Sequence, residues 1–408
     1  MNDQFPPLNE QMDLIRRGTA EIIREEDLAR KIEHSLKTHA PLRVKLGCDP
    51  SRPDLHIGHS VVLRKLRQFQ DLGHHAVLII GDFTGMIGDP SGRSKTRPPL
   101  TLEETRKNGQ SYFEQATRIL STLKIQMLYN SEWLGTMSFS DVIKLGSKYT
   151  VARMLERDDF EKRYRAGEPI SVHELLYPLA QAMDSVAVRS DIELGGTDQK
   201  FNLLVGRDIQ REYGQDPQVT VTMPILPGTD GVEKMSKSLD NYIGISESPQ
   251  QIYGKTLSIP DTLIYDYMLL ATEIPPSELA EVKRQLESGA VNPRDLKRRL
   301  ARTLVTLYHD APAADAAEEE FDRIFKKKDV PDEMPDIRLT TDGGTISIIR
   351  MLVDAGMVKS NSEARRLIEQ GGVSIDGQRV SDATANITLH VPVVLKAGKR
   401  QFARISGA

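Results

Sequence analysis

Two histidines three residues apart, His56 and His59, follow an apolar segment over residues 42–48 that has the length of a buried strand. Apolar residues then recur at helical spacing, which predicts a helix over residues 57–72. The histidines therefore lie in a strand-to-helix turn, where free backbone N–H groups and the positive end of the helix dipole favour a phosphate. Gly58 between them lets a base or ribose approach the backbone closely. Taken alone, the pair is equally typical of two surface histidines beside a turn.

A second candidate segment lies far downstream, where residues 234–238 read Lys-Met-Ser-Lys-Ser. Lys234 and Lys237 would give a flexible loop with two positive charges, which alone is a common surface composition. Arg93 and Arg97 lie in another basic loop, after a glycine-rich turn, and that loop alone is typical of solvated surface. Combined with the histidine turn, these segments predict a nucleoside triphosphate at a helix N-terminus, with mobile cations around its phosphates.

Polar side chains share one face of a predicted helix over residues 173–185. Tyr177, Gln181 and Asp184 stand at positions i, i+4 and i+7 of this otherwise apolar helix, so they lie on the same face. They could bind a small polar ligand or form a buried structural network, and the pattern leaves both interpretations open.

Two further polar residues, Asp198 and Gln199, follow a strand-like segment that ends in Gly195 and Gly196. The two glycines permit close approach of a ligand to the backbone. Asp198 and Gln199 would open a helix at the carboxyl end of a strand, which is where ligands bind in parallel sheets. They are therefore candidates for the same site.

Strand-sized apolar segments alternate with amphipathic helices in the first half of the chain. With helices between them, strands are expected over residues 42–48, 75–81, 125–129, 191–195 and 219–223. This alternation predicts an α/β fold with a doubly wound parallel sheet. We expect residues 1–40 to be helical, and residues 132–172 to form short helical pieces that make an insertion and a subunit contact.

Changes in composition divide the rest of the chain. The pattern after Ser248 is helical and includes an amphipathic helix over residues 292–304, whose basic face we interpret as solvated. A charged, proline-containing segment then predicts a linker. The predicted domains are a Rossmann-like catalytic domain, an α-helical domain, a linker and a small α+β domain, over residues 1–240, 241–325, 326–342 and 343–408. The last should contain a capped helix over 360–370 and a hairpin at Asp376-Gly377.

Bulk properties exclude several classes of protein. The chain has 408 residues, 27% of them charged, and a net charge of -4, which argues against disorder and against general affinity for nucleic acid, including DNA. Cys48 is the only cysteine, which excludes an internal disulfide and fits a cytoplasmic location. The apolar segments are strand-sized and the N-terminus is polar, so we expect neither a membrane span nor a signal peptide.

Charge is spread unevenly along the chain. Nine Lys and Arg residues against six Asp and Glu residues give residues 342–408 a net charge of +3, which leaves -7 for the first 341 residues. The tail is therefore a candidate contact for a polyanion.

Several common nucleotide and hydrolase motifs are missing from the sequence. It contains neither a Walker-type Gly-x-x-x-x-Gly-Lys-Ser/Thr nor a Gly-x-Gly-x-x-Gly before a helix, which disfavours an NTPase or a dehydrogenase. It also contains neither Gly-x-Ser-x-Gly nor His-Glu-x-x-His, which disfavours a hydrolase.

The His-Ile-Gly-His turn over residues 56–59 and the Lys-Met-Ser-Lys-Ser segment resemble the two signatures of class I aminoacyl-tRNA synthetases. Asp49-Pro50, the Gly-Asp-Pro-Ser-Gly of residues 88–92, the Tyr177 helix and the Gly-Gly-x-Asp-Gln of residues 195–199 resemble bacterial tyrosyl-tRNA synthetases. This resemblance covers essentially the whole chain. The tail is similar to the small RNA-binding domain shared with a ribosomal small-subunit protein of the S-four type.

The resemblance implies roles for the residues of an amino-acid site. Asp89, Tyr177 and Gln181 would hold the tyrosine ammonium group, and Asp184 would accept the hydrogen of the substrate phenol. Gln199, with Asp198, would contact the ribose and the activated intermediate.

The resemblance also implies an ATP site. His56 and His59 would contact the phosphates. Lys234 and Lys237 would clamp the pyrophosphate together with Arg93 and Arg97. The ATP site itself would be lined by residues from both halves of the domain: Asp49, Ser51, Gly58, Gly196, Asp198 and Lys237.

The expected partners follow from the same resemblance. They are L-tyrosine, ATP accompanied by Mg²⁺, tRNA(Tyr), and a second copy of the chain in a homodimer, with no metal or organic cofactor bound by the protein itself. In the tail, Lys359, Arg365 and Arg366 would contact the tRNA.

Two residues depart from the family pattern. Where many members carry a tyrosine that helps to recognise the substrate phenol, this chain has Lys45, so recognition of the phenol would rest on Asp184 and an unidentified partner. Where a threonine is common in the ATP-site helix, this chain has Val62, so any hydroxyl contact there is lost.

Three rival interpretations remain. The first is a tryptophanyl-tRNA synthetase, against which Asp184 argues. The second is a nucleotidyltransferase with a His-x-Gly-His site, against which the lysine segment and the tail argue. The third is a non-catalytic RNA-binding regulator, which the intact set of candidate site residues makes unfavourable.

Overall fold

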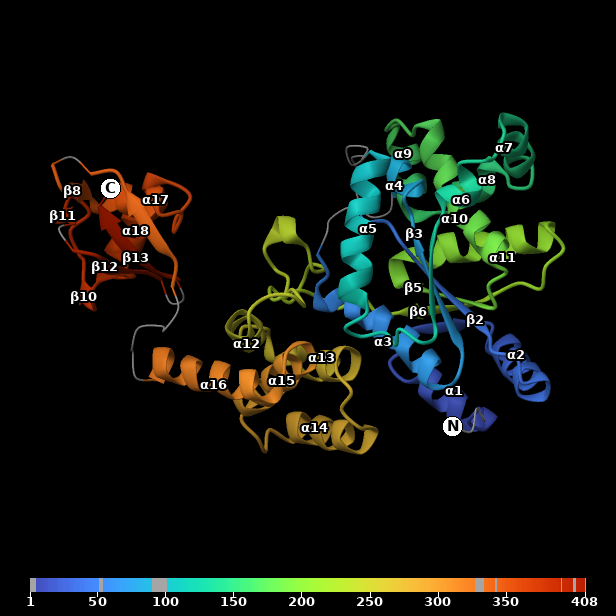
Figure 1. Ribbon diagram of the computed structural model, residues 1–408, viewed down its shortest axis with the longest axis horizontal. Coiled ribbons are helices and arrows are strands. Elements are labelled where there is room, and N and C mark those ends of the chain that lie inside the picture. The colour runs from blue at the N-terminus through green and yellow to red at the C-terminus, as the bar shows by residue number, and fades with distance from the viewer. Residues whose placement is uncertain are drawn as a thin grey trace. The chain divides into compact units, whose positions relative to one another are not determined.

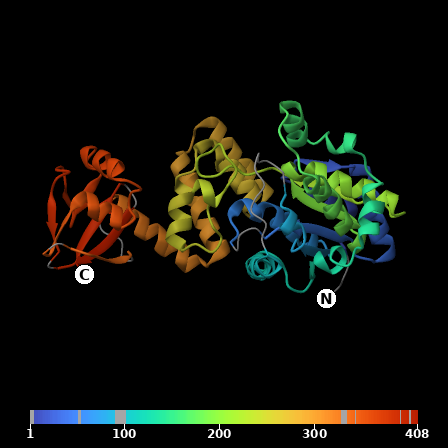
Figure 2. The same ribbon diagram turned by 90° about the horizontal axis from the view of Figure 1, so that it is seen from above.

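The computed structural model describes residues 5–50, 54–89, 101–326, 334–341, 343–389, 391–398 and 401–407. The chain forms two compact units, Met1–Asp315 and Ala316–Ala408, which are shown in Figures 1 and 2. The boundary between the units falls inside the helical domain predicted for residues 241–325, and the predicted boundaries at residues 240 and 325 stay predictions.

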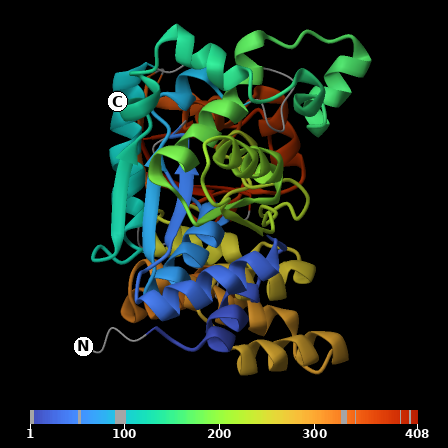
Figure 3. The ribbon, with the colours of Figure 1, turned by 90° about the vertical axis from the view of Figure 1, so that its right-hand side faces the viewer.

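A six-stranded sheet in the order β1-β6-β5-β2-β3-β4 forms the centre of the first unit. All neighbouring strands are parallel except β1, which pairs antiparallel with β6. The strands are β1 (Glu21–Ile23), β2 (Arg43–Cys48), β3 (His75–Ile80), β4 (Ile125–Tyr129), β5 (Ile192–Gly196) and β6 (Val219–Met223). The chain runs outward from β2 to β4 and then returns to β5 on the other side of β2, as Figures 1 and 3 show. This confirms the doubly wound sheet and places its topological switch point between β2 and β5.

Helices cover the sheet, and its strands are buried on both faces. All five residues of β6 are buried, as are five of the six residues of β3. The helices α3 and α11 contact these strands, and α10 packs on α11. The main helices around the sheet are α3 (Ile57–Asp71), α5 (Leu102–Ala116), α10 (Val172–Val188) and α11 (Lys200–Glu212).

The N-terminal segment differs from the prediction that residues 1–40 are helical. It contains two helices, α1 (Leu8–Arg16) and α2 (Glu25–Thr38), with strand β1 between them. The three residues of β1 are too few to show a strand pattern in the sequence, and pairing with β6 is what makes this segment extended.

Short helical pieces follow β4, as predicted for residues 132–172. They are α6 (Ser131–Leu134), α7 (Phe139–Gly146), α8 (Val151–Met154) and α9 (Asp158–Ala166). A short helix α4 (Thr84–Ile87) lies after β3, close to α10.

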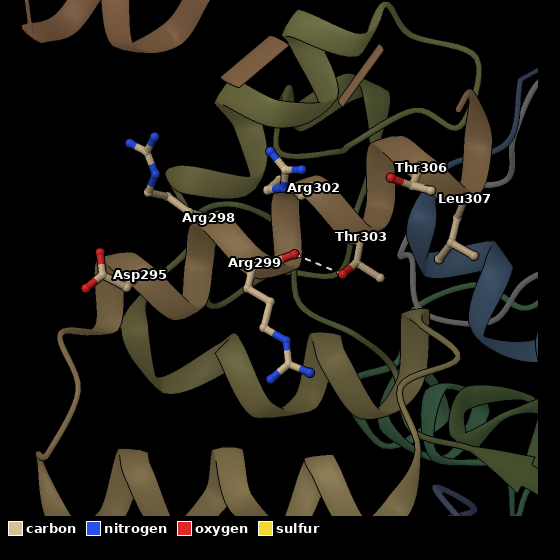
Figure 4. Close-up of a pocket in the computed structure, with 7 residues that line it drawn as sticks. All are labelled: Asp295, Arg298, Arg299, Arg302, Thr303, Thr306 and Leu307. Carbon is tan, nitrogen blue, oxygen red and sulfur yellow. Dashed lines mark hydrogen bonds between the residues drawn. The ribbon is translucent and has the colours of Figure 1, made fainter. Parts of the chain in front are cut away.

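A helical region begins after residue 248, with α12 (Pro249–Leu257), α13 (Ile264–Ala271), α14 (Pro276–Ser288), α15 (Pro293–Tyr308) and α16 (Ala311–Lys326). The basic face of α15 is partly neutralised, because Arg299 pairs with Glu278 and Arg302 pairs with Asp315. Figure 4 shows the hollow of about 570 Å³ along this helix, lined by Asp295, Arg298, Arg299, Arg302, Thr303, Thr306 and Leu307. None of the helices in the described part of the chain has the length and apolarity to span a membrane.

The second unit contains a five-stranded sheet in the order β10-β9-β12-β13-β7 and a two-stranded sheet of β11 and β8. Helices α17 and α18 pack on its apolar core. The elements are β7 (Asp336–Leu339), β8 (Thr345–Ser347), α17 (Ile348–Asp354), α18 (Asn361–Glu369), β9 (Val373–Ile375), β10 (Gln378–Arg379), β11 (Asn386–Thr388), β12 (Val393–Ala397) and β13 (Gln401–Gly407).

Two sequence predictions can be compared with this unit. The Asp376-Gly377 turn joins β9 and β10 with φ of 47° and 80°, as the hairpin requires. In contrast, residues 336–339 were assigned to the linker, and that assignment is wrong because β7 pairs parallel with β13. The prolines and charges before β7 are typical of a linker, and the strand forms because it pairs with β13, which is far along the chain.

A buried ion pair joins the two strands at the switch point. Lys45 on β2 lies directly opposite Glu193 on β5, and its Nζ is 2.7 Å from a Glu193 carboxylate oxygen. Lys45 is 0% exposed and Glu193 is 1% exposed. Because a buried charge is costly without its partner, each group of this pair depends on the other.

Replacing Glu193 by alanine therefore leaves the Lys45 ammonium buried without its counter-ion. We expect the first unit to lose about 3–5 kcal/mol of unfolding free energy, measured by urea unfolding. The matched control is Asp216→Ala, which removes an ion pair to Lys31 of the same 2.7 Å length, but from a carboxylate that is 53% exposed. The control should cost about 1 kcal/mol or less. Equal losses in the two variants would contradict the argument from burial.

Candidate active site

The two histidines lie at the start of α3, immediately after the loop that follows β2. Their ring centroids are 3.8 Å apart, and the His56 backbone N–H donates to His59 Nδ1 at 3.3 Å. Burial lowers the pKa of His56 to about 2, with the neighbouring His59 as a further cause, and burial lowers the pKa of His59 to about 4. Both imidazoles are therefore neutral near pH 7 and can offer N–H donors to a phosphate without carrying charge.

The lysine segment folds directly onto the histidine turn. The Gly58 N–H donates to Met235 Sδ at 3.3 Å, and the Ile57 N–H donates to the Ile243 carbonyl at 2.9 Å. A Cβ on Gly58 would lie 3.0 Å from the His56 ring and 3.6 Å from Met235, so this position accommodates only a small residue. The sequence predicted free N–H groups here, and that prediction is wrong for Ile57 and Gly58. Their partners instead bring the two signature segments into contact.

Both lysines of this segment are paired with carboxylates in the site. Lys234 Nζ donates to Asp198 at 3.2 Å, and Lys237 pairs with Asp54. Asp198 lies at the carboxyl end of β5, in a short 3-10 turn, and Gly196 is needed there because a Cβ would lie 2.6 Å from Asp198 Oδ1. The two cations therefore lie between the ends of β2 and β5, and each can exchange a carboxylate partner for a phosphate.

Asp49, the first residue after β2, is held by two hydroxyl groups. The Tyr177 hydroxyl donates to it at 2.6 Å and the Thr84 hydroxyl donates to it at 2.7 Å. Gly81 permits this arrangement, because a Cβ there would lie 1.9 Å from Asp49 Oδ1. The structure thus joins an ATP-site candidate and a tyrosine-site candidate in one hydrogen bond, which their spacing in the sequence did not indicate.

Asp184 is buried on α10 and accepts two hydrogen bonds. Trp133 Nε1 donates to it at 2.9 Å and Asn130 Nδ2 donates to it at 3.4 Å. Burial raises the pKa of Asp184 to about 7, against the opposing effects of Lys45 and of these two donors. Sequence reasoning missed both donors, although Trp133 is the only tryptophan of the chain and follows the carboxyl end of β4.

Lys45 makes its contacts inside the protein. Besides its ion pair with Glu193, its Nζ donates to Ser185 Oγ at 2.8 Å and to the Gln181 carbonyl at 3.2 Å. Lys45 thereby braces the turn of α10 that carries Asp184. The partners of Asp184 that the sequence left unidentified are the side chains of Asn130 and Trp133.

Asp89 and Gln199 also meet, although 110 positions separate them in the sequence. Gln199 Nε2 donates to one Asp89 oxygen at 2.9 Å, and Arg157 donates to the other at 3.2 Å. Gln181 is half-buried on the same helix as Tyr177 and Asp184, as its position in the sequence predicted.

Three of the predicted site residues, Ser51, Arg93 and Arg97, lie outside the described residues. Within the described ranges, we find no group of three or more His, Cys, Asp or Glu side chains arranged to hold a metal ion.

Two family models together match almost the whole chain. Residues 37–326 match the class I tRNA synthetases (W and Y), and residues 326–405 match the tyrosine–tRNA ligase SYY-like C-terminal domain. The solved structure of tyrosyl-tRNA synthetase from Archaeoglobus fulgidus, complexed with L-tyrosine, has the same fold. It superposes with a TM-score of 0.64 at 24% sequence identity, over 76% of this chain and 99% of that chain.

Relatives of known name extend the similarity over the full length. The tyrosine–tRNA ligase of Salinibacter ruber is 58% identical over 98% of this chain and 97% of the relative. That of Chlorobium luteolum is 58% identical over 99% of both chains, and that of Thermotoga maritima is 54% identical over 98% of both chains. By the matched models and these identities, the chain belongs to the class I tRNA synthetases (W and Y) and, within them, to the tyrosine–tRNA ligases.

Proposed function

We propose that this chain activates L-tyrosine with ATP and transfers the tyrosyl group to tRNA(Tyr). The observation that carries the proposal is the contact of Met235 with the Gly58 N–H, because it holds Lys234 and Lys237 beside His56 and His59. This arrangement suits a chain of phosphates better than any other ligand. The membership in the tyrosine–tRNA ligases supports tyrosine as the amino acid.

The first step requires no general base, because the tyrosine carboxylate is already ionised. One of its oxygens attacks the α-phosphorus of ATP in line, an O–P bond forms, and pyrophosphate leaves with the electrons of the broken bond. The task of the protein is to position the reactants and to stabilise charge on the leaving group. Mg²⁺ enters with ATP and neutralises part of the phosphate charge.

Phosphates compete with two carboxylates for the lysines of the site. Lys234 and Lys237 interact with Asp198 and Asp54 until phosphates compete for them. Cations that move onto the phosphates as charge develops stabilise the transition state more than the ground state. His56 and His59 add neutral donors, and Arg93 and Arg97 remain predicted members of the same clamp. In the second step, a ribose hydroxyl of the tRNA 3′ end attacks the tyrosyl carbonyl and AMP leaves.

The amino-acid site distinguishes the two ends of tyrosine. We assign the ammonium group to Asp89, Tyr177 and Gln181, and the ribose and the intermediate to Asp198 and Gln199. The phenol is assigned to Asp184, because this carboxylate is buried and is held in place by hydrogen bonds from Trp133 and Asn130. Phenylalanine has no hydroxyl group to donate to this buried carboxylate, and the lost hydrogen bond gives the basis for discrimination. The larger indole of tryptophan carries no hydroxyl for the same position.

The second unit is the proposed contact for tRNA. Lys359, Arg365 and Arg366 are exposed on or just before α18, and residues 342–408 have a net charge of +3, in contrast to the negative charge of the rest of the chain.

Deleting residues 343–408 should spare tyrosine activation and reduce tRNA charging. Equal loss of both activities would place the tail in the catalytic fold instead.

A homodimer is proposed from an apolar surface on the insertion. Five large apolar side chains between residues 139 and 172 are 59–81% exposed: Phe139, Ile143, Val151, Tyr164 and Val172. Several large exposed apolar side chains on one segment of the chain are typical of an interface, and a two-fold axis would bury them against their own copies. We further propose that the protein works in the cytoplasm, where its proposed tRNA partner is used in translation.

The function is tested by amino-acid-dependent exchange of pyrophosphate into ATP, without tRNA. We expect exchange with tyrosine alone among the twenty amino acids. Lys234→Ala and Lys237→Ala should slow exchange about 100-fold or more, with the tyrosine KM nearly unchanged, because we assign these side chains to the phosphates and not to the amino acid. Lys283→Ala, on the surface of α14, is the control. Exchange with tryptophan would overturn the specificity, and no exchange at all would overturn the activity.

Tyrosine binding should depend on pH through Asp184. Burial raises the pKa of this carboxyl to about 7, so the group is protonated below that pH and loses acceptor capacity for the phenol. The tyrosine KM is expected to fall as pH rises from about 6 to about 8, while Asp184→Asn abolishes this dependence. A pH profile that is the same in both proteins would exclude Asp184 as the titrating group.

The homodimer is tested by Phe139→Asp, which places a charge in the apolar surface. We expect sedimentation equilibrium to shift from twice the chain mass to the chain mass at micromolar concentration. Exposed Leu123, on the loop before β4, gives the control Leu123→Asp, which should leave the mass unchanged. A monomeric parent protein would contradict the proposal directly.

A further inference from the structure

Arg157 and Asn202 lie beside the amino-acid site, and neither belongs to the residues assigned to it above. Arg157 precedes α9 in the insertion, and Asn202 lies on the first turn of α11. Arg157 is 5% exposed and Asn202 is 2% exposed, so neither is a surface residue. Their burial requires partners that compensate for it.

Those partners complete a closed ring of four side chains. Arg157 donates to Asp89 at 3.2 Å, and Gln199 donates to the other Asp89 oxygen at 2.9 Å. Asn202 donates to Gln199 Oε1 at 3.0 Å and accepts from Arg157 at 3.3 Å. Every member of the ring is thereby fixed by two others. Two of the four, Asp89 and Gln199, are proposed contacts of the substrate.

Arg157 is itself held from outside the ring. Its guanidinium lies between two carboxylates, at 3.2 Å from Asp89 and at 2.7 Å from Asp159, and it also lies 5.0 Å from the centre of the Phe160 ring. Arg157 is therefore fixed in place while it holds Asp89.

We propose that Arg157 and Asn202 are positioning residues for the tyrosine ammonium group. Arg157 holds Asp89 by one oxygen and leaves the carboxylate in the orientation in which it can accept from the substrate. Asn202 orients the Gln199 amide, so that its NH₂ group points at Asp89 and its oxygen points away. The inference rests on the proposed function, since it requires that Asp89 binds the substrate ammonium.

The position of Arg157 gives the insertion a role in the site. Residues 132–172 contribute Trp133 to the phenol end of the pocket and Arg157 to the ammonium end. Both act on a carboxylate, Asp184 or Asp89, that comes from outside the insertion. Recognition of the two ends of tyrosine therefore depends on one segment that itself lies outside the parallel sheet.

The test measures which part of the ligand each variant stops recognising. Arg157→Gln and Asn202→Ala are compared with the parent in tyrosine-dependent exchange, with tyramine and 3-(4-hydroxyphenyl)propionate as competing inhibitors. Tyramine keeps the ammonium group, and the propionate lacks it. For Arg157→Gln we expect the tyrosine KM and the tyramine inhibition constant to rise about tenfold, with kcat and the ATP KM changed less than about threefold. Inhibition by the propionate should stay within about twofold of the parent.

Two further variants separate positioning from a general structural role. Arg157→Lys keeps the positive charge but lacks the planar guanidinium group, and it should recover part of the tyrosine affinity that Arg157→Gln loses. Arg163→Gln is the matched control, because Arg163 is a half-buried arginine on α9, the helix that Arg157 precedes, and it pairs with Glu174, which is outside the ring. It should leave all three ligands unchanged. Thermal unfolding of each variant verifies folding, and Asn202→Ala preserves the test if Arg157→Gln fails to fold.

Two outcomes would overturn the inference. Equal weakening of tyrosine, tyramine and the propionate would mean that the ring supports the whole pocket and does not position the ammonium contact. An unchanged tyrosine KM in both folded variants would mean that Asp89 needs neither neighbour. A parent protein that shows no tyrosine-dependent exchange would instead refute the proposed function, so the two failures are distinguishable.

Discussion

The site depends on one contact, between the amide groups that open α3 and the segment of residues 235–243. A helix start normally leaves its first N–H groups without partners inside the helix. Here Met235 and Ile243 supply partners for Gly58 and Ile57. An isolated bridge between His56 and Gly244 continues the pairing. Lys237 lies between these two anchors and Lys234 directly precedes the first of them, so the same contact that satisfies the helix start also places the two cations.

Around this contact lie two kinds of group, the uncharged histidines and the lysines that pair with carboxylates. Burial lowers the pKa of both histidines and leaves them uncharged, while the two lysines are only partly buried and pair with carboxylates that they can exchange. Their carboxylate partners keep the cations near the site. A phosphate chain can replace those partners at small cost, because the exchange trades one ion pair for another.

The amino-acid side of the site is built differently, from fixed hydrogen bonds. Thr84 donates to Asp49 and accepts from Asn130, and Asn130 donates in turn to Asp184. This row of side chains joins the ends of β2, β3 and β4 to α10. Lys45 adds a brace beneath α10 through its pair with Glu193. Recognition of a small ligand requires such rigidity, whereas binding of phosphates requires that the lysines move.

The sequence by itself determined the doubly wound sheet, the two signature segments and the Tyr177 helix, because hydrophobic periodicity and residue spacing are local properties. It also indicated the family. It did not indicate β1 or β7, since short strands are defined by partners far along the chain. Nor did it indicate that Asn130, Trp133, Arg157 and Asn202 support the candidate residues. Which polar groups meet is decided by which strand ends lie side by side, and only the tertiary structure contains that information.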